Sequence, residues 1–392
     1  MKVVYLDPGL GAGKGHNFAM VHEFDQALAS ERGLDLHHVL QQQASAERLP
    51  ALKGRVHNTI KIDGYTRLAA TEVLDAQRKE ALLASVAADL AQAGVQDADV
   101  ILMPTVYPLH LLALAQHVPL APHCRVVLGL LLPCSFWTPD SLTERALAGL
   151  MVDSVNLLAN KAQLLAYSET GTFRFADNVV PMATLLPPVA RPNATLVRDL
   201  AARARNASPT DGAPILGFFG SPFGTKGFAL LIQTLQAMAQ ANKQPSMQVQ
   251  IHLPPGHEVM CAQLRALAPW IMATSADTDN ATYLRQMAAV DVVWALYDPH
   301  EYNTKMSGIV PEAISLGKPL LLADGCTALQ DFLERHAPGS FVLAPYDASG
   351  VEASLGMERT DWLHPLRCAQ AHAPLLQEMK SMDRFLAVCG LH

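Results

Sequence analysis

Short apolar runs alternate with longer amphipathic stretches along the first half of the chain, a pattern typical of a doubly wound α/β domain. The run at residues 125–132 is almost purely aliphatic, as expected of a parallel strand covered on both faces. We expect strands at residues 2–6, 34–39, 59–62, 99–103, 125–132 and 164–168, and helices at 16–28, 71–93, 108–117 and 142–162. A further helix should start after Glu169, and residues 179–186 should be extended.

The pattern restarts after a connection at residues 187–211, where we expect prolines to be followed by a helix rich in arginine and alanine and by a polar turn. Strands are expected at 215–219, 247–253, 291–295, 320–323 and 341–343, helices at 228–241, 259–267, 283–289, 309–316 and 329–336, and a mostly helical tail at 361–391. The predicted fold is therefore α/β, with two tandem Rossmann-like doubly wound domains that face a cleft. Ligands of such sheets bind at the carboxyl ends of the strands, so the glycine-rich loop of each half should line that cleft.

Composition and charge narrow the class of protein. The 392 residues are 50% hydrophobic and 17% charged, with a net charge of −7, which argues against a nucleic-acid binder. The six cysteines form no C-x-x-C pair and are expected to be reduced. The amino terminus lacks the apolar core of a signal peptide, and the longest apolar stretch, residues 126–134, is too short to span a bilayer. These features predict a cytoplasmic protein without a transmembrane segment.

The first glycine-rich loop, residues 7–16, fits neither common nucleotide motif. Pro8 stands where a Walker A loop needs its first glycine, and Lys14 stands where the Rossmann spacing needs its third. The remaining signal is a flexible loop, with Gly13 and Gly15, that leads into a helix at His16 and could approach a ligand closely. A plain tight turn is the alternative for the loop, and a surface or capping role is the alternative for His16.

The second loop, GFFGSPFGTKG at residues 217–227, lies between a predicted strand and a helix. It contains Gly220 and places Lys226 just before the helix, where an ammonium could neutralise a diphosphate; a solvated lysine in a turn is the alternative.

A second anion-binding element is expected at residues 307–312. Ser307, Gly308 and Ile309 stand at a predicted helix start, where free N–H groups bind anions, and Glu312 lies one turn on, in reach of a sugar hydroxyl. Phosphate beside ribose is what a nucleotide offers. No zinc-binding histidine pattern and no serine or cysteine nucleophile signature is present, so we expect no metal and no bound cofactor.

Four segments together resemble those of GT-B glycosyltransferases, particularly the large retaining family 4. SGIVPEAISLGKP, residues 307–319, resembles the donor-binding segment, and ILGFFGSPFGTKG, residues 215–227, resembles the phosphate loop. AAVDVVWALYDPHEY, residues 288–302, resembles the strand and loop ahead of the donor helix, and NVVPMATLLPPV, residues 178–189, resembles the end of the first domain. The loop at residues 13–16 has a counterpart there as well.

The resemblance implies roles for individual residues. Glu312 matches the second acid of the family's E-x₇-E pair, which binds the donor ribose, whereas Thr304 stands in place of the first acid, with Glu301 nearby. Lys226 matches the loop lysine, and Ser221 replaces an arginine. The candidate catalytic residues are His16, Lys226, Glu301 and Thr304, and the candidate donor-binding residues are Gly13, Gly15, Gly220, Lys226, Ser307, Gly308, Ile309 and Glu312. The family's histidine is missing near residues 133–135.

The resemblance also implies a division of labour and an activity. Residues 1–187 would form an N-terminal domain on the acceptor side, residues 188–368 a C-terminal domain for the nucleotide sugar, and residues 369–392 a helix that packs back on the first domain. The implied activity is a metal-independent hexosyl or related transfer (EC 2.4), with retention, from a nucleoside-diphosphate sugar to an unknown acceptor: a glycan, lipid, protein or small molecule. A catalytically weak relative that binds nucleotide sugars or serves as a partner subunit is the alternative, and an epimerase of the same fold is a third possibility.

Overall fold

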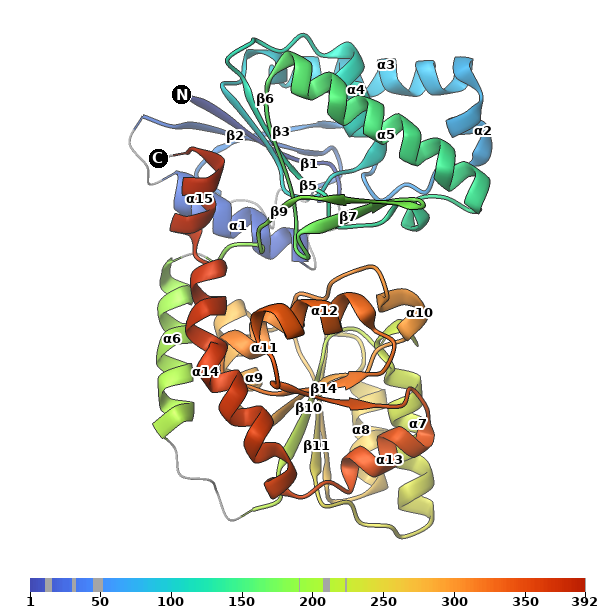
Figure 1. Ribbon diagram of the computed structural model, residues 1–392, viewed down its shortest axis with the longest axis vertical. Coiled ribbons are helices and arrows are strands. Elements are labelled where there is room, and N and C mark those ends of the chain that lie inside the picture. Colours follow the sequence, from blue (N-terminus) through green and yellow to red (C-terminus); the bar gives the residue numbers. More distant parts are fainter. Residues whose placement is uncertain are drawn as a thin grey trace. The chain divides into compact units, whose positions relative to one another are not determined.

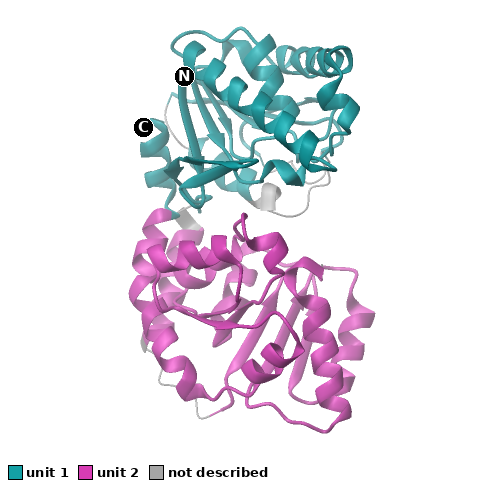
Figure 2. Cartoon of the chain, turned by 45° about the vertical axis from the view of Figure 1, so that its right-hand side comes forward, with its two compact units in different colours: residues 1–191, 380–392 teal, residues 192–379 magenta. Residues whose placement is uncertain are grey.

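The structure is a computed structural model of the chain that describes residues 1–10, 16–29, 33–44, 52–189, 191–206, 212–222 and 224–391. It divides into two compact units: unit 1 is Met1–Arg191 with Lys380–His392, and unit 2 is Pro192–Met379 (Figures 1 and 2). Each unit has its own parallel sheet.

Unit 1 is built on a parallel sheet with helices on both faces (Figure 1). The strand order is β3-β2-β1-β4-β5-β6-β9. The strands are β1 (Lys2–Asp7), β2 (Asp35–Gln41), β3 (Arg55–Ile60), β4 (Val100–Met103), β5 (Arg125–Gly129), β6 (Gln163–Ser168) and β9 (Ala183–Thr184). The helices are α1 (His16–Leu28), α2 (Ala70–Leu74), α3 (Ala76–Gln92), α4 (Pro108–His117), α5 (Ser141–Lys161) and α15 (Met382–Cys389).

Alternate residues of β1 supply two separate cores, because successive strand side chains point to opposite faces. Val4 and Leu6 join the core under α3, α4 and α5. Val3 and Tyr5 join the core under α1 and α15. Both faces are therefore buried, which explains why the strands read as continuous apolar runs.

Unit 2 repeats the same strand order in a second parallel sheet, β12-β11-β10-β13-β14-β15. Its strands are β10 (Ile215–Phe219), β11 (Gln248–Leu253), β12 (Ile271–Ser275), β13 (Val292–Ala295), β14 (Leu320–Ala323) and β15 (Phe341–Ala344). Its helices are α6 (Arg191–Asn206), α7 (Phe228–Gln240), α8 (Glu258–Leu267), α9 (Asn280–Ala289), α10 (Pro299–Tyr302), α11 (Ile309–Ser315), α12 (Thr327–His336), α13 (Ala348–Leu355) and α14 (Leu363–Met379). Helix α7 packs with α8 and α13, and α14 packs with α11 and α12.

In both units the first strand lies inside the sheet, with the next two strands on one side and the later strands on the other. The order reverses between β1 and β4 in unit 1, and between β10 and β13 in unit 2. A crevice opens at such a reversal, outside the carboxyl ends of the strands, and ligands bind there. The predicted pair of doubly wound α/β domains is thus confirmed.

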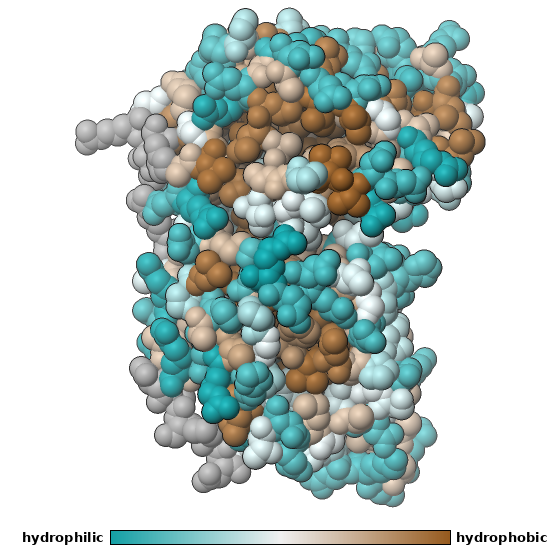
Figure 3. Space-filling model, viewed as in Figure 1, coloured by the Kyte–Doolittle hydropathy of each residue, from teal (hydrophilic) through white to brown (hydrophobic). Residues whose placement is uncertain are grey.

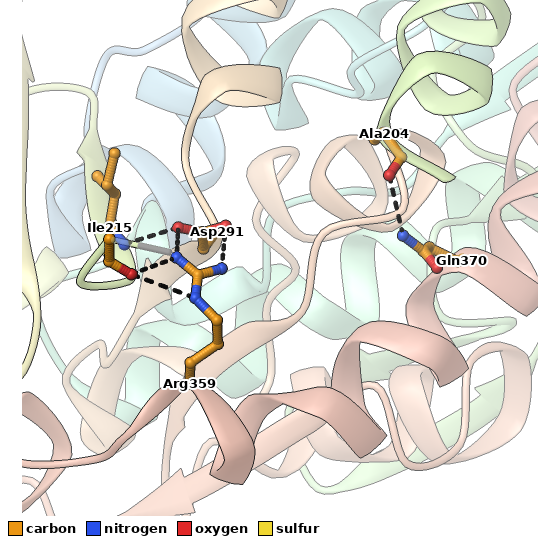
Figure 4. A network of polar contacts seen from close by, with 6 residues as sticks. Ala204, Ile215, Asp291, Arg359 and Gln370 are labelled. Carbon is orange, nitrogen blue, oxygen red and sulfur yellow. Dashed lines mark hydrogen bonds and ion pairs between the residues drawn. The ribbon is translucent and has the colours of Figure 1, made fainter. Parts of the chain in front are cut away.

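Polar contacts connect β10 and β13 at their amino ends, which lie at the end of the unit 2 sheet opposite to the carboxyl ends of the strands (Figure 4). Asp291 accepts a hydrogen bond from the N–H of Ile215 at 2.9 Å and pairs with Arg359, whose Nη1 lies 3.3 Å from Oδ1. Arg359 also donates to the carbonyl of Gly212. In the same view, the Gln370 amide donates to the carbonyl of Ala204 and so links α14 to α6. The amino ends of these strands are occupied by structural contacts, so a ligand is expected at their carboxyl ends.

Several predicted elements differ in the structure. The helix expected after Glu169 is wrong: residues there form an antiparallel hairpin of β7 (Thr172–Phe175) and β8 (Asn178–Pro181), which turns through Ala176 at a φ of 48°. The single helix expected at residues 71–93 is broken at Asp75, whose side chain caps α3. Strand β12 and helix α13 were not anticipated.

The predicted terminal segment is also corrected. Residues 369–379 were expected to pack on the first domain with the rest of the tail, but they continue α14 and belong to unit 2. The reason is that α14 lies against α11, and the Gln377 amide donates to the carbonyl of Ser315 at 2.7 Å. Helix α15 belongs to unit 1, where the rings of Phe385 and Phe24 have their centres 5.1 Å apart.

No helix in the described ranges is long and apolar enough to cross a membrane. Apolar residues reach the surface among many polar ones on the face shown in Figure 3, as in most globular proteins. None of the six cysteines forms a disulfide, and five of them are buried.

Candidate functional site

The candidate site lies in unit 2, where β10 and β13 end side by side. The two strands pair in parallel, with Leu216 opposite Val292 and Gly217 opposite Val293. Strand β10 leads through residues 220–227 into α7, and β13 leads through residues 296–308 into α11. Both connecting segments therefore leave the sheet at the reversal of strand order.

The loop after β10 is shaped by two glycines with left-handed backbones. Gly220 has a φ of +115° and Gly227 a φ of +69°, a conformation that other residues rarely adopt. A methyl group on Gly220 would lie 3.0 Å from Nζ of Lys226, so the lysine folds back over this glycine. The carbonyl of Lys226 accepts a hydrogen bond from Nε1 of Trp294 at 3.0 Å. The loop is thus fixed to β13, with its ammonium above the strand end.

Burial sets the electrostatics of Lys226. It lowers the pKa of the ammonium from its usual value, the carboxylate of Glu312 acts in the opposite direction, and the positive charge of Lys305 lowers the pKa further. The ammonium also lies 6.0 Å from the centre of the Tyr297 ring. A partly desolvated cation of this kind gains from binding a negative group, which replaces the lost hydration.

The segment after β13 brings a second set of donors. Ser307 is only 7% exposed, and the N–H of Val310 donates back to its carbonyl at 3.0 Å. Gly308 and Ile309 stand at the N-cap and the first position of α11, where the backbone N–H groups have no partner within the helix. Helix α11 is only 7 residues long, so its dipole is a small contribution, and the site depends on these two groups and on side chains.

Glu312 projects from the first turn of α11 and is held from another helix. The hydroxyl of Tyr283, on α9, donates to Oε2 of Glu312 at 2.9 Å. Burial, and then the charge of Glu312, raises the pKa of Tyr283 well above its usual value, so the hydroxyl remains a donor at any physiological pH. The carboxylate is thereby held in place, within electrostatic reach of Lys226.

A pocket of ≈ 230 Å³ opens next to these residues at the carboxyl ends of β10, β11 and β12. Its lining includes Phe219, Gly220, His252, Thr274 and Tyr283. The His252 ring stacks on Phe219 with centres 5.0 Å apart and planes 8° apart, and its Nδ1 lies 3.0 Å from Oγ1 of Thr274. Burial lowers the pKa of His252, so the ring is neutral near pH 7. The pocket wall is therefore flat, aromatic and uncharged on this side.

The predicted site residues fall into three groups. The first group lies at the carboxyl ends of β10 and β13 in the unit 2 sheet and comprises Gly220, Lys226, Ser307, Gly308, Ile309 and Glu312. A methyl group on Gly220 would be 3.0 Å from Nζ of Lys226 and 3.9 Å from Cδ1 of Ile309, so these elements meet.

The second group is Glu301 and Thr304, in the segment between β13 and α11, and the third group comes from residues 13–16. Glu301 and Thr304 are exposed, and Glu301 forms an ion pair with Lys305 at 2.7 Å. His16 begins α1 in unit 1, and Gly13 and Gly15 lie outside the described residues.

Sequence reasoning missed Tyr283, Phe219, His252 and Thr274 as site residues. They carry no motif, and only the predicted position of Phe219 at a strand end could have pointed to one of them. In the described part of the chain, no group of three or more histidine, cysteine, aspartate or glutamate side chains could hold a metal ion.

Solved structures with the same arrangement were found for the whole chain. The HepE protein of Anabaena in complex with UDP is 15% identical with a TM-score of 0.61, covering 98% of this chain and 97% of that one. The UDP-forming trehalose-phosphate synthase of Burkholderia xenovorans in complex with glucose-6-phosphate is 13% identical with a TM-score of 0.57, covering 100% of both chains. Spinosyn rhamnosyltransferase SpnG in complex with spinosyn aglycone is 16% identical with a TM-score of 0.54, covering 99% of this chain and 100% of that one.

The chain has the GT-B fold. The expected resemblance to GT-B glycosyltransferases is confirmed at the level of the fold. No protein-family model matches the sequence, and no curated protein is similar to it. At identities this low the GT-B likeness fixes the architecture, so the roles of the site residues depend on the geometry described above.

Proposed function

We propose that the chain is a glycosyltransferase that uses a nucleoside-diphosphate sugar as donor. The observation that carries this proposal is that the Lys226 ammonium, folded over Gly220, lies within electrostatic reach of the Glu312 carboxylate, which is held by Tyr283. A buried cation suits a diphosphate, and a fixed carboxylate a short distance away suits the two hydroxyls of a ribose. The adjoining flat pocket suits a nucleobase, which would stack against its aromatic wall.

The chemistry of such a site is electrostatic. The bond between the anomeric carbon and the β-phosphate oxygen breaks, a bond forms between that carbon and a nucleophilic atom of the acceptor, and the acceptor's proton passes to the departing diphosphate or to solvent. Negative charge develops on the diphosphate as it leaves. Lys226, with the N–H groups of Gly308 and Ile309, would stabilise that charge in a setting where burial has already removed water. Because the protein supplies the positive charge itself, we propose that transfer is independent of divalent metal and continues in the presence of a chelator. Retention at the anomeric carbon is part of the proposal and rests on the resemblance to family 4.

Uridine diphosphate and UDP-glucose are the first ligands to test. Structures of HepE hold UDP and UDP-glucose, and the trehalose-phosphate synthase is named as UDP-forming. A thermal-shift panel of UDP-, GDP- and ADP-sugars would identify base and sugar together, since a ligand at 100 times its Kd adds about 2.7 kcal/mol of stability. The acceptor, whether glycan, lipid, protein or small molecule, is left open by this proposal.

Calorimetry on two variants tests the donor site. Lys226→Ala and Glu312→Ala should each remove detectable binding of the nucleotide sugar while the circular dichroism spectrum and melting profile stay those of a folded protein. Binding that is unchanged in both variants contradicts the proposal. Val259→Ala is a suitable control, because Val259 is 74% exposed on α8 and is not part of the site.

A second candidate function is a nucleotide-sugar-binding or partner subunit with weak catalysis. It is favoured by the exposed Thr304, which stands where the resemblance to retaining family 4 implies an acid, and by Glu301, which is already paired with Lys305. This candidate predicts tight binding without turnover. Release of free nucleotide from the donor by the wild-type protein, without any acceptor, would exclude it.

A further inference from the structure

Tyr283 links two parts of the candidate site that come from different segments of the chain. Its ring lines the pocket and meets the Phe219 ring edge to face, with centres 5.9 Å apart and planes at 85°. Its hydroxyl donates to Oε2 of Glu312 at 2.9 Å. One side chain on α9 therefore contacts both the aromatic wall after β10 and the carboxylate on α11.

The orientation of the Glu312 carboxylate depends on such a contact. A glutamate side chain has several rotatable bonds, and fixing them costs conformational free energy unless a partner holds the terminal group. The phenol hydroxyl is a neutral donor to a charged acceptor, which is among the stronger hydrogen bonds in proteins. Tyr283 itself is fixed, because α9 is capped by Asp279, whose carboxylate accepts from the N–H of Thr282, and because its ring is held against Phe219.

We propose that Tyr283 is a positioning residue that presents the Glu312 carboxylate to the ribose hydroxyls of the donor and couples base binding in the pocket to ribose binding. A base that enters the pocket packs on the Tyr283 ring and restrains it, which in turn restrains the carboxylate. The preference for a nucleotide with both ribose hydroxyls over one that lacks them then arises from contacts with Glu312, and these contacts depend on Tyr283. This inference rests on the proposed nucleotide-sugar function and adds a residue that no sequence motif marks.

Tyr283→Phe removes only the hydroxyl and leaves the ring against Phe219. The test uses whichever of UDP, GDP and ADP binds the wild-type protein most tightly, together with its 2′,3′-dideoxy counterpart. Calorimetry measures the affinity of each protein for both ligands. The wild type should lose about tenfold or more in affinity when the ribose hydroxyls are removed, as expected for hydrogen bonds to a charged group. The variant should bind the natural ligand about tenfold more weakly than the wild type and should lose little further affinity for the dideoxy ligand.

Two further variants separate positioning from a general structural effect. In a Glu312→Ala background, adding Tyr283→Phe should lower the free energy of unfolding by less than it does in the wild type, because the hydroxyl has no carboxylate left to hold. Tyr346→Phe removes a hydroxyl that contacts the carbonyl of Gly224 and should leave the ribose discrimination as in the wild type.

The inference is overturned if Tyr283→Phe binds both ligands as the wild type does. It is equally overturned if the variant weakens both by the same factor, since that is a structural effect unrelated to ribose. A wild-type protein that binds none of the three nucleotides overturns the proposed function and this inference with it, so the two failures are distinguishable.

Discussion

A methyl group on Gly227 would lie 2.1 Å from the carbonyl oxygen of Leu296. The position of the added methyl carbon is fixed by the backbone of residue 227, and the oxygen belongs to the backbone of Leu296. No side-chain rotation can therefore relieve the overlap. Gly227 also has a φ of +69°, where a side chain adds strain. The loop that carries Lys226 can therefore approach the end of β13 only because residue 227 has no side chain.

Gly227→Ala should lower the free energy of unfolding by about 2–4 kcal/mol, from left-handed strain and steric overlap together. It should also weaken nucleotide binding, because the loop with Lys226 must move away from Leu296. Gly308→Ala is the matched control for stability: its φ is −56°, and nothing lies within 4 Å of the added methyl. Urea unfolding should place that variant within about 1 kcal/mol of the wild type. Equal losses in the two variants would contradict the steric argument.

Nucleotide binding should be coupled to proton uptake at alkaline pH. Burial lowers the pKa of Lys226, and the negative charge of a bound diphosphate would raise it again. Above the lowered pKa the free protein has lost the proton, so binding takes one up, and affinity falls as the pH rises. Calorimetry in two buffers of different ionisation enthalpy measures this uptake. Lys226→Arg, which stays charged throughout, should bind without it. The same uptake in both proteins would place the titrating group elsewhere.

Acid should destabilise unit 1 through His110. This side chain is 1% exposed on α4, and burial lowers its pKa from 6.5 to about 3. The unfolded chain takes up the proton below pH 6.5 and the folded chain does not, so this contribution to stability is complete above pH 6.5 and is lost as the pH falls toward 3. At about pH 4.5 the loss is roughly 2–3 kcal/mol. Denaturant unfolding of His110→Leu should show a correspondingly smaller pH dependence over this range, and an unchanged dependence would assign the effect to other groups.

The last helix should be a strong determinant of unit 1 stability. Phe385 is 1% exposed, and its ring lies 5.1 Å from Phe24 and 5.7 Å from Tyr167. Phe385→Ala should lower the free energy of unfolding by about 3–5 kcal/mol, because it leaves a cavity among these rings. Val388, on the same helix, is 44% exposed, and Val388→Ala should cost less than about 1 kcal/mol. Hydrogen exchange of α15 that is unaffected by Phe385→Ala would be inconsistent with this packing.

The two-unit fold could be predicted from sequence because both sheets are covered on both faces, so their central strands are unbroken apolar runs. Strand β14, with four buried residues, is an example. Strand β12 was missed because it lies at the sheet edge: its burial alternates along IMATS, and its polar positions hide the strand. The hairpin after Glu169 was missed for a similar reason: all residues of β8 are exposed, so the strand has no apolar pattern imposed by burial.

The candidate site was predictable only where glycines constrain the backbone. Gly220 and Gly227 mark the loop that places Lys226, and the Ser307-Gly308 start of α11 marks Glu312. Tyr283 is separated from Glu312 by 29 positions and lies on a separate helix. Nothing in its local sequence distinguishes it from an ordinary amphipathic helix residue. Its proposed role follows from tertiary structure, which brings the Tyr283 ring against Phe219 at the end of β10 and its hydroxyl against Glu312 on α11.

The assignment of Lys380–His392 to unit 1 has a consequence for how the protein is made. Unit 2 is a single continuous segment, Pro192–Met379, whereas the core of unit 1 is closed by α15, and Arg125 donates to the carbonyl of Cys389 at 2.7 Å. A chain that emerges from the ribosome in order exposes every residue of unit 2 before α15 is available. The unit that is synthesised first is thus the last to be completed. Until then the apolar face around Tyr5 and Phe24 lacks the cover that α15 provides in the folded protein.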